Sequence, residues 1–224
     1  MAGGQGTRLR PLTFSLPKPL LPVGERPIIE IILRQLRHRG FTRAFVSVGF
    51  KGHLIRAYLA EVKIDGLEID YITEDEPLGT AGPLRLLPDD VEDLFMINGD
   101  ILTAVDFGRV LREHRHAQAE HLTVVVHQHA VPLPYGVFRL DGITVTGVDE
   151  KPTLRMPVAT GMYALDRRAI DALPTGRSDM PDLINDLASR GAVRAHLIDE
   201  FWTDVADLAD YERVNLDADR WAEF

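Results

Sequence analysis

Short apolar runs that alternate with amphipathic stretches are the feature of this sequence that most limits its fold. Four runs rich in β-branched and aromatic residues, bounded by polar turns, are typical of strands: residues 45–49, 67–72, 94–98 and 122–126. Residues 27–39 and 53–62 have helical spacing, and the first begins with a proline and ends before Gly40. This alternation predicts an α/β fold with a Rossmann-like, mostly parallel sheet and helices on both faces. Ligands of such folds bind at the carboxyl ends of the strands.

Composition limits the size of the fold and the class of partner. With 224 residues, 45% of them apolar, we expect one domain over residues 1–224. A net charge of −9 and the lack of a dense basic run argue against nucleic acid or an anionic membrane as partner. The absence of cysteine excludes disulfides and thiolate chemistry. With no apolar stretch long enough to span a bilayer, we expect a cytoplasmic protein, and a homo-oligomer stays open.

A glycine-rich segment near the start predicts a phosphate site. Residues 3–13 read Gly-Gly-Gln-Gly-Thr-Arg-Leu-Arg-Pro-Leu-Thr, and Pro-Lys-Pro-Leu-Leu-Pro-Val follows at 17–23. Glycines allow backbone N–H groups to crowd against an anion, and Arg8 and Lys18 place two cations nearby. The segment therefore favours a clamp for a polyphosphate.

Two familiar phosphate-binding loops do not fit this segment. A P-loop requires Gly-Lys-Ser/Thr, but Gly6 is followed by Thr7 and Arg8. A dinucleotide-binding loop requires a small residue three positions after Gly6, where Leu9 stands. The alternative is a glycine-rich turn that binds no ligand. The long motif that follows Gly6, through residue 23, argues against that alternative.

The pattern closely resembles the signature of the sugar-1-phosphate nucleotidyltransferases. Its residues are most similar to those of the mannose-1-phosphate guanylyltransferase-like branch. Further matching segments follow in the family's order, at residues 76–82, 98–100, 135–137, 149–152, 160–163 and 202–204. These enzymes join a nucleoside triphosphate to a sugar 1-phosphate and release pyrophosphate. The resemblance implies the nucleotide-diphospho-sugar transferase fold, with a nucleotide-binding half at about 1–125 and a smaller sugar-phosphate-binding lobe at about 126–224.

The resemblance also implies how the phosphates are held. Arg8 would grip the triphosphate and the leaving group, and Lys18 would reach the α-phosphate and the attacking oxygen. The alternative is that Arg8 and Lys18 are ordinary charged side chains on the solvated surface. The residues implied in the rest of the phosphate loop are Gly3, Gly4, Gly6 and Thr7.

Two carboxylates are candidates for a magnesium site. Asp100 follows the run 94–98 and a glycine, at the end of a predicted strand, and Asp204 occupies the second matching family position after Trp202. Mg²⁺ takes hard oxygen ligands, typically one or two carboxylates plus substrate phosphates, so this pair could hold the ion against the α-phosphate. That arrangement suits in-line attack between two polyanions. A lone aspartate at a strand end is otherwise a cap or turn residue.

The residues implied to bind the sugar 1-phosphate acceptor include one that differs from the family pattern. Glu150 would accept hydrogen bonds from sugar hydroxyls, Lys151 would pair with the sugar phosphate, and Gly136 would let the backbone approach the ring. A hairpin with a chance ion pair is the alternative. Ala159 stands where the family usually has Asn, and Ala206 where it has Gly. Because Ala159 offers no side-chain hydrogen bond, we expect a modified sugar or a cyclitol 1-phosphate as acceptor.

Residues 73–84 carry the signal for which nucleotide base is bound. The motif Leu-Gly-Thr-Ala-Gly-Pro-Leu in this segment resembles the guanylyltransferase branch and so favours guanine. Guanine presents N1–H and an amine on one edge, and Glu74 or Glu76 could accept from both. Gly79 and Thr80 complete the predicted nucleotide contacts. Uridylyl, thymidylyl and adenylyl transfer stay open, because related sequences share parts of this motif. A catalytically silent sugar-nucleotide-binding regulator is the rival from another class, although it would be expected to lose the cations or carboxylates retained here.

The start of the sequence conflicts with the implied fold. The family places a buried strand directly before Ala-Gly-Gly, but only Met1 precedes Ala2. A sheet that lacks a central strand would expose two unpaired edges and much apolar surface. We therefore expect a few apolar residues upstream of Met1.

Overall fold

The computed structural model describes residues 1–74, 76–117 and 120–221. Its α-helices are α1 (Ile28–His38), α2 (Gly52–Glu61), α3 (Phe107–His116), α4 (Arg167–Asp171), α5 (Met180–Ser189) and α6 (Leu208–Leu216). Its strands are β1 (Pro22–Val23), β2 (Arg26–Pro27), β3 (Arg43–Val48), β4 (Glu68–Thr73), β5 (Asp93–Ile97), β6 (Ile101–Thr103), β7 (Leu122–Pro132), β8 (Val137–Asp141), β9 (Thr144–Asp149), β10 (Thr153–Asp166), β11 (Val193–Ile198) and β12 (Trp202–Asp204). Short 3-10 turns include Thr7–Leu9, Lys18–Leu20 and Gly82–Leu86. No helix in these described ranges is long and apolar enough to cross a membrane.

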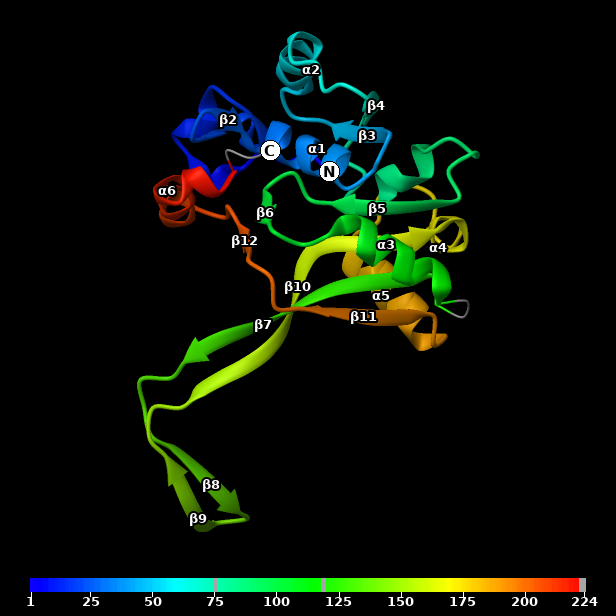
Figure 1. Cartoon of the computed structure of the whole chain (residues 1–224). Coiled ribbons are helices and arrows are strands. Elements are labelled where there is room, and N and C mark those ends of the chain that lie inside the picture. The colour runs from blue at the N-terminus through cyan, green and yellow to red at the C-terminus, as the bar shows by residue number, and fades with distance from the viewer. Residues whose placement is uncertain (75, 118–119, 222–224) are drawn as a thin grey trace.

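The largest sheet has the strand order β11-β7-β10-β5, and β3 and β4 form a separate parallel pair beside it (Figure 1). The α/β fold is confirmed, and every predicted strand and helix is present, with β7 running on to Pro132. The pairing is mixed rather than mostly parallel: β11 is parallel to β7, but β10 is antiparallel to both β7 and β5. The reason is local, since the β8–β9 hairpin reverses the chain between β7 and β10 and allows only antiparallel return.

Helices cover both faces of this sheet, as predicted. Successive strand residues point to opposite faces, and β10 shows the two environments. Met162 and Ala164 belong to the buried cluster that contains the apolar residues of α1 and α3. Tyr163 and Leu165 belong to a second cluster with the apolar residues of α4 and α5. The sheet is therefore buried on both faces where β10 pairs with β5.

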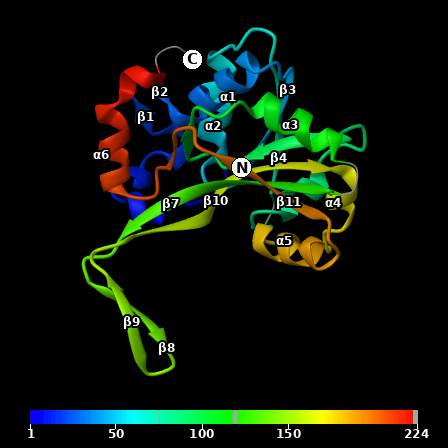
Figure 2. The ribbon, with the colours of Figure 1, turned by 60° about the horizontal axis from the view of Figure 1, so that its bottom comes forward.

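A two-stranded arm leaves the body of the molecule. The outer parts of β7 and β10 extend away from it and end in the β8–β9 hairpin, which both views show (Figures 1 and 2). The register between β7 and β10 shifts between Ala159 and Tyr163, and this bulge separates the arm from the buried part of the sheet. The predicted division between residues 125 and 126 falls inside the continuous strand β7.

Candidate functional site

A cavity of about 450 Å³ opens where β4 and β5 end. This is the position expected for a ligand in an α/β fold. Most of the predicted phosphate, nucleotide and metal residues line it: Gly3, Gly4, Gly6, Thr7, Arg8, Lys18, Glu74, Gly79, Thr80 and Asp100. Segments from four separate parts of the chain therefore converge at one cavity, and the roles predicted for these residues stay predictions.

The glycine-rich loop is fixed at its far end by short-range contacts. Gly6 has φ +59°, a conformation that favours glycine, and a Cβ there would lie 2.9 Å from Cγ2 of Thr13. The Thr13 hydroxyl donates to the Gly6 carbonyl over 2.8 Å. Leu9 is fully buried, whereas Arg8, its neighbour in the same 3-10 turn, is exposed at the cavity. Burial of Leu9 anchors the turn, and exposure of Arg8 leaves its guanidinium accessible to an anion.

Lys18 and Asp100 form an ion pair at the cavity. The Lys18 ammonium donates to Asp100 Oδ2, and the two side chains are 12% and 28% exposed. Lys18 begins a 3-10 turn whose next residues, Pro19 and Leu20, are buried. Opposite charges at this separation attract each other, and partial exposure to solvent weakens that attraction. The pair joins the predicted clamp to the predicted metal site.

The second predicted metal ligand lies beside the first. In the antiparallel pair β6–β12, Asp204 is opposite Ile101, and the N–H of Val205 donates to the carbonyl of Asp100 over 2.9 Å. Residues of the described ranges form no group of three or more His, Cys, Asp or Glu able to hold a metal. Asp100 lines the cavity and Asp204 does not, so the two residues are neighbours through the backbone of β6 and β12. Their roles as Mg²⁺ ligands, with substrate phosphates and water completing the set, stay a prediction.

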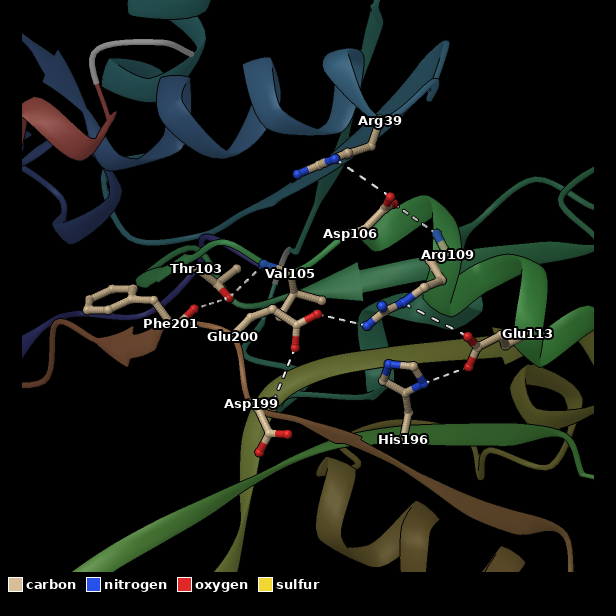
Figure 3. A network of polar contacts seen from close by, with 10 residues as sticks. All are labelled: Arg39, Thr103, Val105, Asp106, Arg109, Glu113, His196, Asp199, Glu200 and Phe201. Atoms are coloured by element: carbon tan, nitrogen blue, oxygen red, sulfur yellow. Dashed lines mark hydrogen bonds and ion pairs between the residues drawn. The ribbon is translucent and has the colours of Figure 1, made fainter.

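A polar network holds the segment that leads into β12 (Figure 3). Arg109 of α3 donates to Glu200 over 2.8 Å, and Glu113 of the same helix pairs with His196 over 2.9 Å. The Thr103 hydroxyl of β6 donates to the carbonyl of Phe201 over 2.8 Å. Burial alone would raise the pKa of Glu200, but its backbone hydrogen bonds and Arg109 outweigh burial and hold that pKa below its usual range. The network positions β12, and hence Asp204, from outside the cavity.

Glu74 has structural partners as well as a place in the cavity. Its Oε1 accepts from the Ser47 hydroxyl over 2.6 Å, and its Oε2 accepts from the N–H of Leu78 over 3.0 Å. A Cβ on Gly3 would lie 3.2 Å from the same Oε1. An ionised carboxylate has about four acceptor positions, so these bonds leave capacity for a ligand.

Sequence reasoning missed Arg177 and Asp179, which also line the cavity. The N–H of Thr80 donates to Asp179 Oδ1 over 2.9 Å, and this bond holds the pKa of Asp179 below its usual range. The Thr80 hydroxyl accepts from the N–H of Met180 over 2.8 Å. An aspartate before Met-Pro is a sequence signal for a helix start, here of α5, but it carries no sign that the side chain turns toward Thr80.

The predicted acceptor residues lie apart from the cavity. Gly136, Glu150 and Lys151 lie along the arm, outside β8 and β9, and neither they nor Ala159 line the cavity. A Cβ on Gly136 would lie 3.0 Å from Glu150 Oε2, so these two residues are close to each other. Ala159 is exposed at the bulge of β10, and the next carbonyl, of Thr160, accepts from the indole N–H of Trp202. The roles of these four residues stay predictions.

Comparison with known proteins agrees with this geometry. Residues 1–220 match the family described as Nucleotidyl transferase, and the chain belongs to that family. It is 30% identical to mannose-1-phosphate guanyltransferase beta-A of Xenopus laevis over 94% of this chain and 61% of the relative. It is 28% identical to mannose-1-phosphate guanylyltransferase of Mycobacterium tuberculosis over 97% of this chain and 63% of the relative. The chain thus spans about three fifths of these relatives.

Among solved structures, a protein from Bacillus anthracis described as a glucose-1-phosphate thymidylyltransferase, in complex with sucrose, superposes with a TM-score of 0.77. Its sequence identity is 26%, and the match covers 97% of this chain and 92% of that one. HddC from Yersinia pseudotuberculosis superposes with a TM-score of 0.73 at 22% identity, over 96% of each chain. The implied nucleotide-diphospho-sugar transferase fold is confirmed.

Proposed function

We propose that this chain transfers a nucleoside monophosphate, GMP from GTP, to a sugar or cyclitol 1-phosphate and releases pyrophosphate. The observation that carries the proposal is the Lys18–Asp100 ion pair beside the glycine-rich loop, with Asp204 on the adjoining strand. In this proposal Lys18 would contact a phosphate, and its partner Asp100 would hold a metal ion beside it. This is the arrangement that nucleotidyl transfer requires.

The residues act chiefly by neutralising charge. Asp100 and Asp204 would hold Mg²⁺, which supplies charge neutralisation and orientation at the α-phosphate when bound. Lys18 leaves its pairing with Asp100 to contact the α-phosphate and the incoming phosphate oxygen. Arg8, exposed at the mouth, meets the β- and γ-phosphates that depart. Neutralisation of both polyanions lets the acceptor oxygen attack in line with the leaving group.

Guanine is the base we propose. Two curated relatives at about 30% identity are named for guanylyl transfer to mannose 1-phosphate. The acceptor capacity left on Glu74 suits the N1–H and amine edge of guanine. The thymidylyltransferase likeness makes dTTP the main competitor.

The proposal is tested by pyrophosphate release with GTP, ATP, CTP, UTP and dTTP against a panel of sugar and cyclitol 1-phosphates. We expect GTP to give the highest kcat/KM, and activity to disappear in excess chelator and return with Mg²⁺. Another base as best substrate would correct the guanine assignment alone. Tight nucleotide binding without turnover across the whole panel would instead identify a binding protein that lacks activity.

A further inference from the structure

The β8–β9 hairpin at the end of the arm has one apolar face. Residues directly opposite each other in a strand pair point to the same face, and successive residues alternate between the two faces. Phe138 is opposite Val148, and Leu140 is opposite Val145. These four side chains are between 51% and 62% exposed. Arg139, which lies between Phe138 and Leu140, points to the other face. The hairpin is therefore amphipathic, and its apolar face meets solvent.

The hairpin stands clear of the body of the molecule (Figures 1 and 2). The outer parts of β7 and β10 hold it there, because their pairing runs without a break from Thr153 opposite Pro132 to Ala159 opposite Val126. Every residue of β8 is exposed. A two-stranded hairpin with nothing packed on it is only marginally stable in water. An exposed apolar face of this kind therefore indicates a surface that binds a partner.

The predicted acceptor residues lie at the base of the same hairpin. Gly136 directly precedes β8, and Glu150 and Lys151 connect β9 to β10. Lys151 has φ +46°, which is uncommon for a residue with a side chain and marks a defined turn. None of these three residues lines the cavity beside the glycine-rich loop. One chain in this conformation therefore does not bring its nucleotide residues and its predicted acceptor residues together.

An apolar surface next to the nucleotide cavity matches the apolar face of the hairpin. Leu12, Phe14 and Leu16 follow the glycine-rich loop and are 37%, 63% and 39% exposed. The Thr13 hydroxyl donates to the carbonyl of Gly6 over 2.8 Å, which fixes this segment against the loop. A hairpin packed on this surface would bring its base toward the mouth of the cavity. The chain thus carries both an apolar arm and an apolar surface suited to receive one.

The distribution of charge favours contact between copies through the arm. The rest of the chain carries the whole formal net charge of −9, so the bodies of two copies repel each other. The arm, residues 126–158, has no net charge and can approach an acidic body without this repulsion. Its three basic residues equal its three acidic ones in number: Arg139, Lys151 and Arg155 against Asp141, Asp149 and Glu150.

We propose that the hairpin binds a second copy of this chain, with its apolar face on the surface around Phe14 of that copy. The base of the arm then supplies Glu150 and Lys151 to the nucleotide cavity of the second copy. The exchange is reciprocal about a two-fold axis, so both arms are covered and both cavities are completed. The role given to Glu150 and Lys151 rests on the proposed function, whereas the contact between copies does not.

Sedimentation velocity over a range of micromolar concentrations tests the contact. We expect a dimer, and Phe138→Gln combined with Leu140→Gln should raise its dissociation constant by roughly 100-fold. Val137→Gln, next to Phe138 but on the opposite face, should change that constant by less than about threefold. Circular dichroism verifies that both variants stay folded, since these side chains are exposed in a single chain. A wild-type monomer, or a double variant that dimerises as tightly as Val137→Gln, would overturn the proposal.

Cross-linking identifies the surface that receives the arm. The chain has no cysteine, so each introduced cysteine is the only thiol in its chain. A Leu140→Cys chain is mixed with a tagged Leu16→Cys chain and treated with a short bismaleimide. We expect at least about tenfold more mixed product than from Val137→Cys with Leu16→Cys, because only Leu140 is on the apolar face. Cross-linking solely within a chain that carries both cysteines would show that the arm folds onto its own body, and would refute exchange.

Mixing two impaired chains tests supply of the acceptor residues between copies. Lys18→Met leaves the arm intact and Lys151→Met leaves the cavity intact, and each alone should lose most activity. After equal mixing, half of the dimers are mixed and each holds one complete site, so about a quarter of wild-type turnover should return. No recovery beside an active wild type, or full activity of Lys151→Met alone, would overturn this supply. An inactive wild type would refute the proposed function instead, and sedimentation and cross-linking would still decide the contact.

Discussion

Val205 donates its backbone N–H to the carbonyl of Asp100 over 2.9 Å, and this bond joins the residue after β12 to the residue before β6. Asp204 is opposite Ile101 in the pairing of β6 with β12, so the backbone of Asp204 lies next to that of Asp100, which directly precedes β6. Arg109 and Glu200 hold the approach to β12 from outside. The candidate metal site therefore depends on strand pairing as much as on the two side chains.

The first prediction concerns Asp100→Asn. The amide keeps the shape but loses the charge that would hold Mg²⁺, so turnover should fall by roughly 100-fold or more. Stability should change by less than about 1 kcal/mol, because the pair with Lys18 is partly exposed. Steady-state pyrophosphate release and urea unfolding measure the two effects. Asp199→Asn, at an exposed position, makes the same charge change as a control. Near-normal turnover of Asp100→Asn at saturating Mg²⁺ would contradict the metal assignment.

The second prediction concerns Lys18→Met, which keeps most of the apolar stem and removes the cation. If Lys18 neutralises charge that develops in the transition state, kcat should fall much more than nucleotide affinity. Steady-state kinetics and direct nucleotide titration separate the two. Arg10→Met, in the same segment but outside the residues that line the cavity, is the matched control. A rise in KM with kcat intact would show instead that Lys18 binds only ground-state phosphate.

The third prediction concerns the acceptor. Ala159 is exposed and offers no side-chain hydrogen bond, so a hydroxyl of an acceptor that covers it would stay unpaired, at about 1–3 kcal/mol or roughly five- to a hundredfold in kcat/KM. We expect glucose and mannose 1-phosphate to be poorer substrates than an analogue that lacks or displaces one ring hydroxyl. Ala159→Asn should narrow that gap when kcat/KM is compared across the panel. If the ordinary hexose phosphates are already preferred and Asn brings no gain, an unusual acceptor is ruled out.

The fourth prediction uses two glycines with positive φ. Gly79 has φ +83°, and a Cβ there would lie 2.4 Å from the carbonyl oxygen of Ser178; Gly142 has φ +58° and open space around it. Gly79→Ala should therefore destabilise the fold by about 2 kcal/mol more than Gly142→Ala, because backbone strain is common to both and the clash is not. Urea unfolding of the two variants measures the difference. Equal costs would mean that the loop carrying Gly79 relaxes away from Ser178.

The fifth prediction concerns pH and is made for a chain whose amino terminus is Met1. The Met1 amine has a folded-state pKa of about 6 against a reference of 8.0, so the unfolded chain binds more protons between these values. Stability should rise as pH increases from 6 to 8, by up to about 3 kcal/mol for two pKa units, and this contribution is lost on acidification. Urea unfolding in chelator, with and without acetylation of the amine, isolates the effect from histidines such as His114, whose pKa burial also lowers. An unchanged pH slope after acetylation would show that the amine is not buried.

The sequence by itself determined the local elements and predicted a phosphate site in the glycine-rich segment. The apolar runs at 45–49 and 94–98 became β3 and β5, because period and β-propensity act within a few residues. Gly6 and Leu9 specified a tight turn in the same short-range way. Asp100 was expected near a ligand site because it follows a strand end, and Arg8 and Lys18 were grouped with it through the resemblance to the family.

Only the tertiary structure decided which distant segments meet. The antiparallel return of β10, the contact of Thr80 with Asp179, and the adjacency of Asp204 to Asp100 depend on pairing between residues far apart in the chain. A cavity of about 770 Å³ between β3 and β5 likewise exists only in three dimensions. Local propensity cannot encode these relationships, because each is settled by competition among whole elements for burial and for backbone hydrogen bonds.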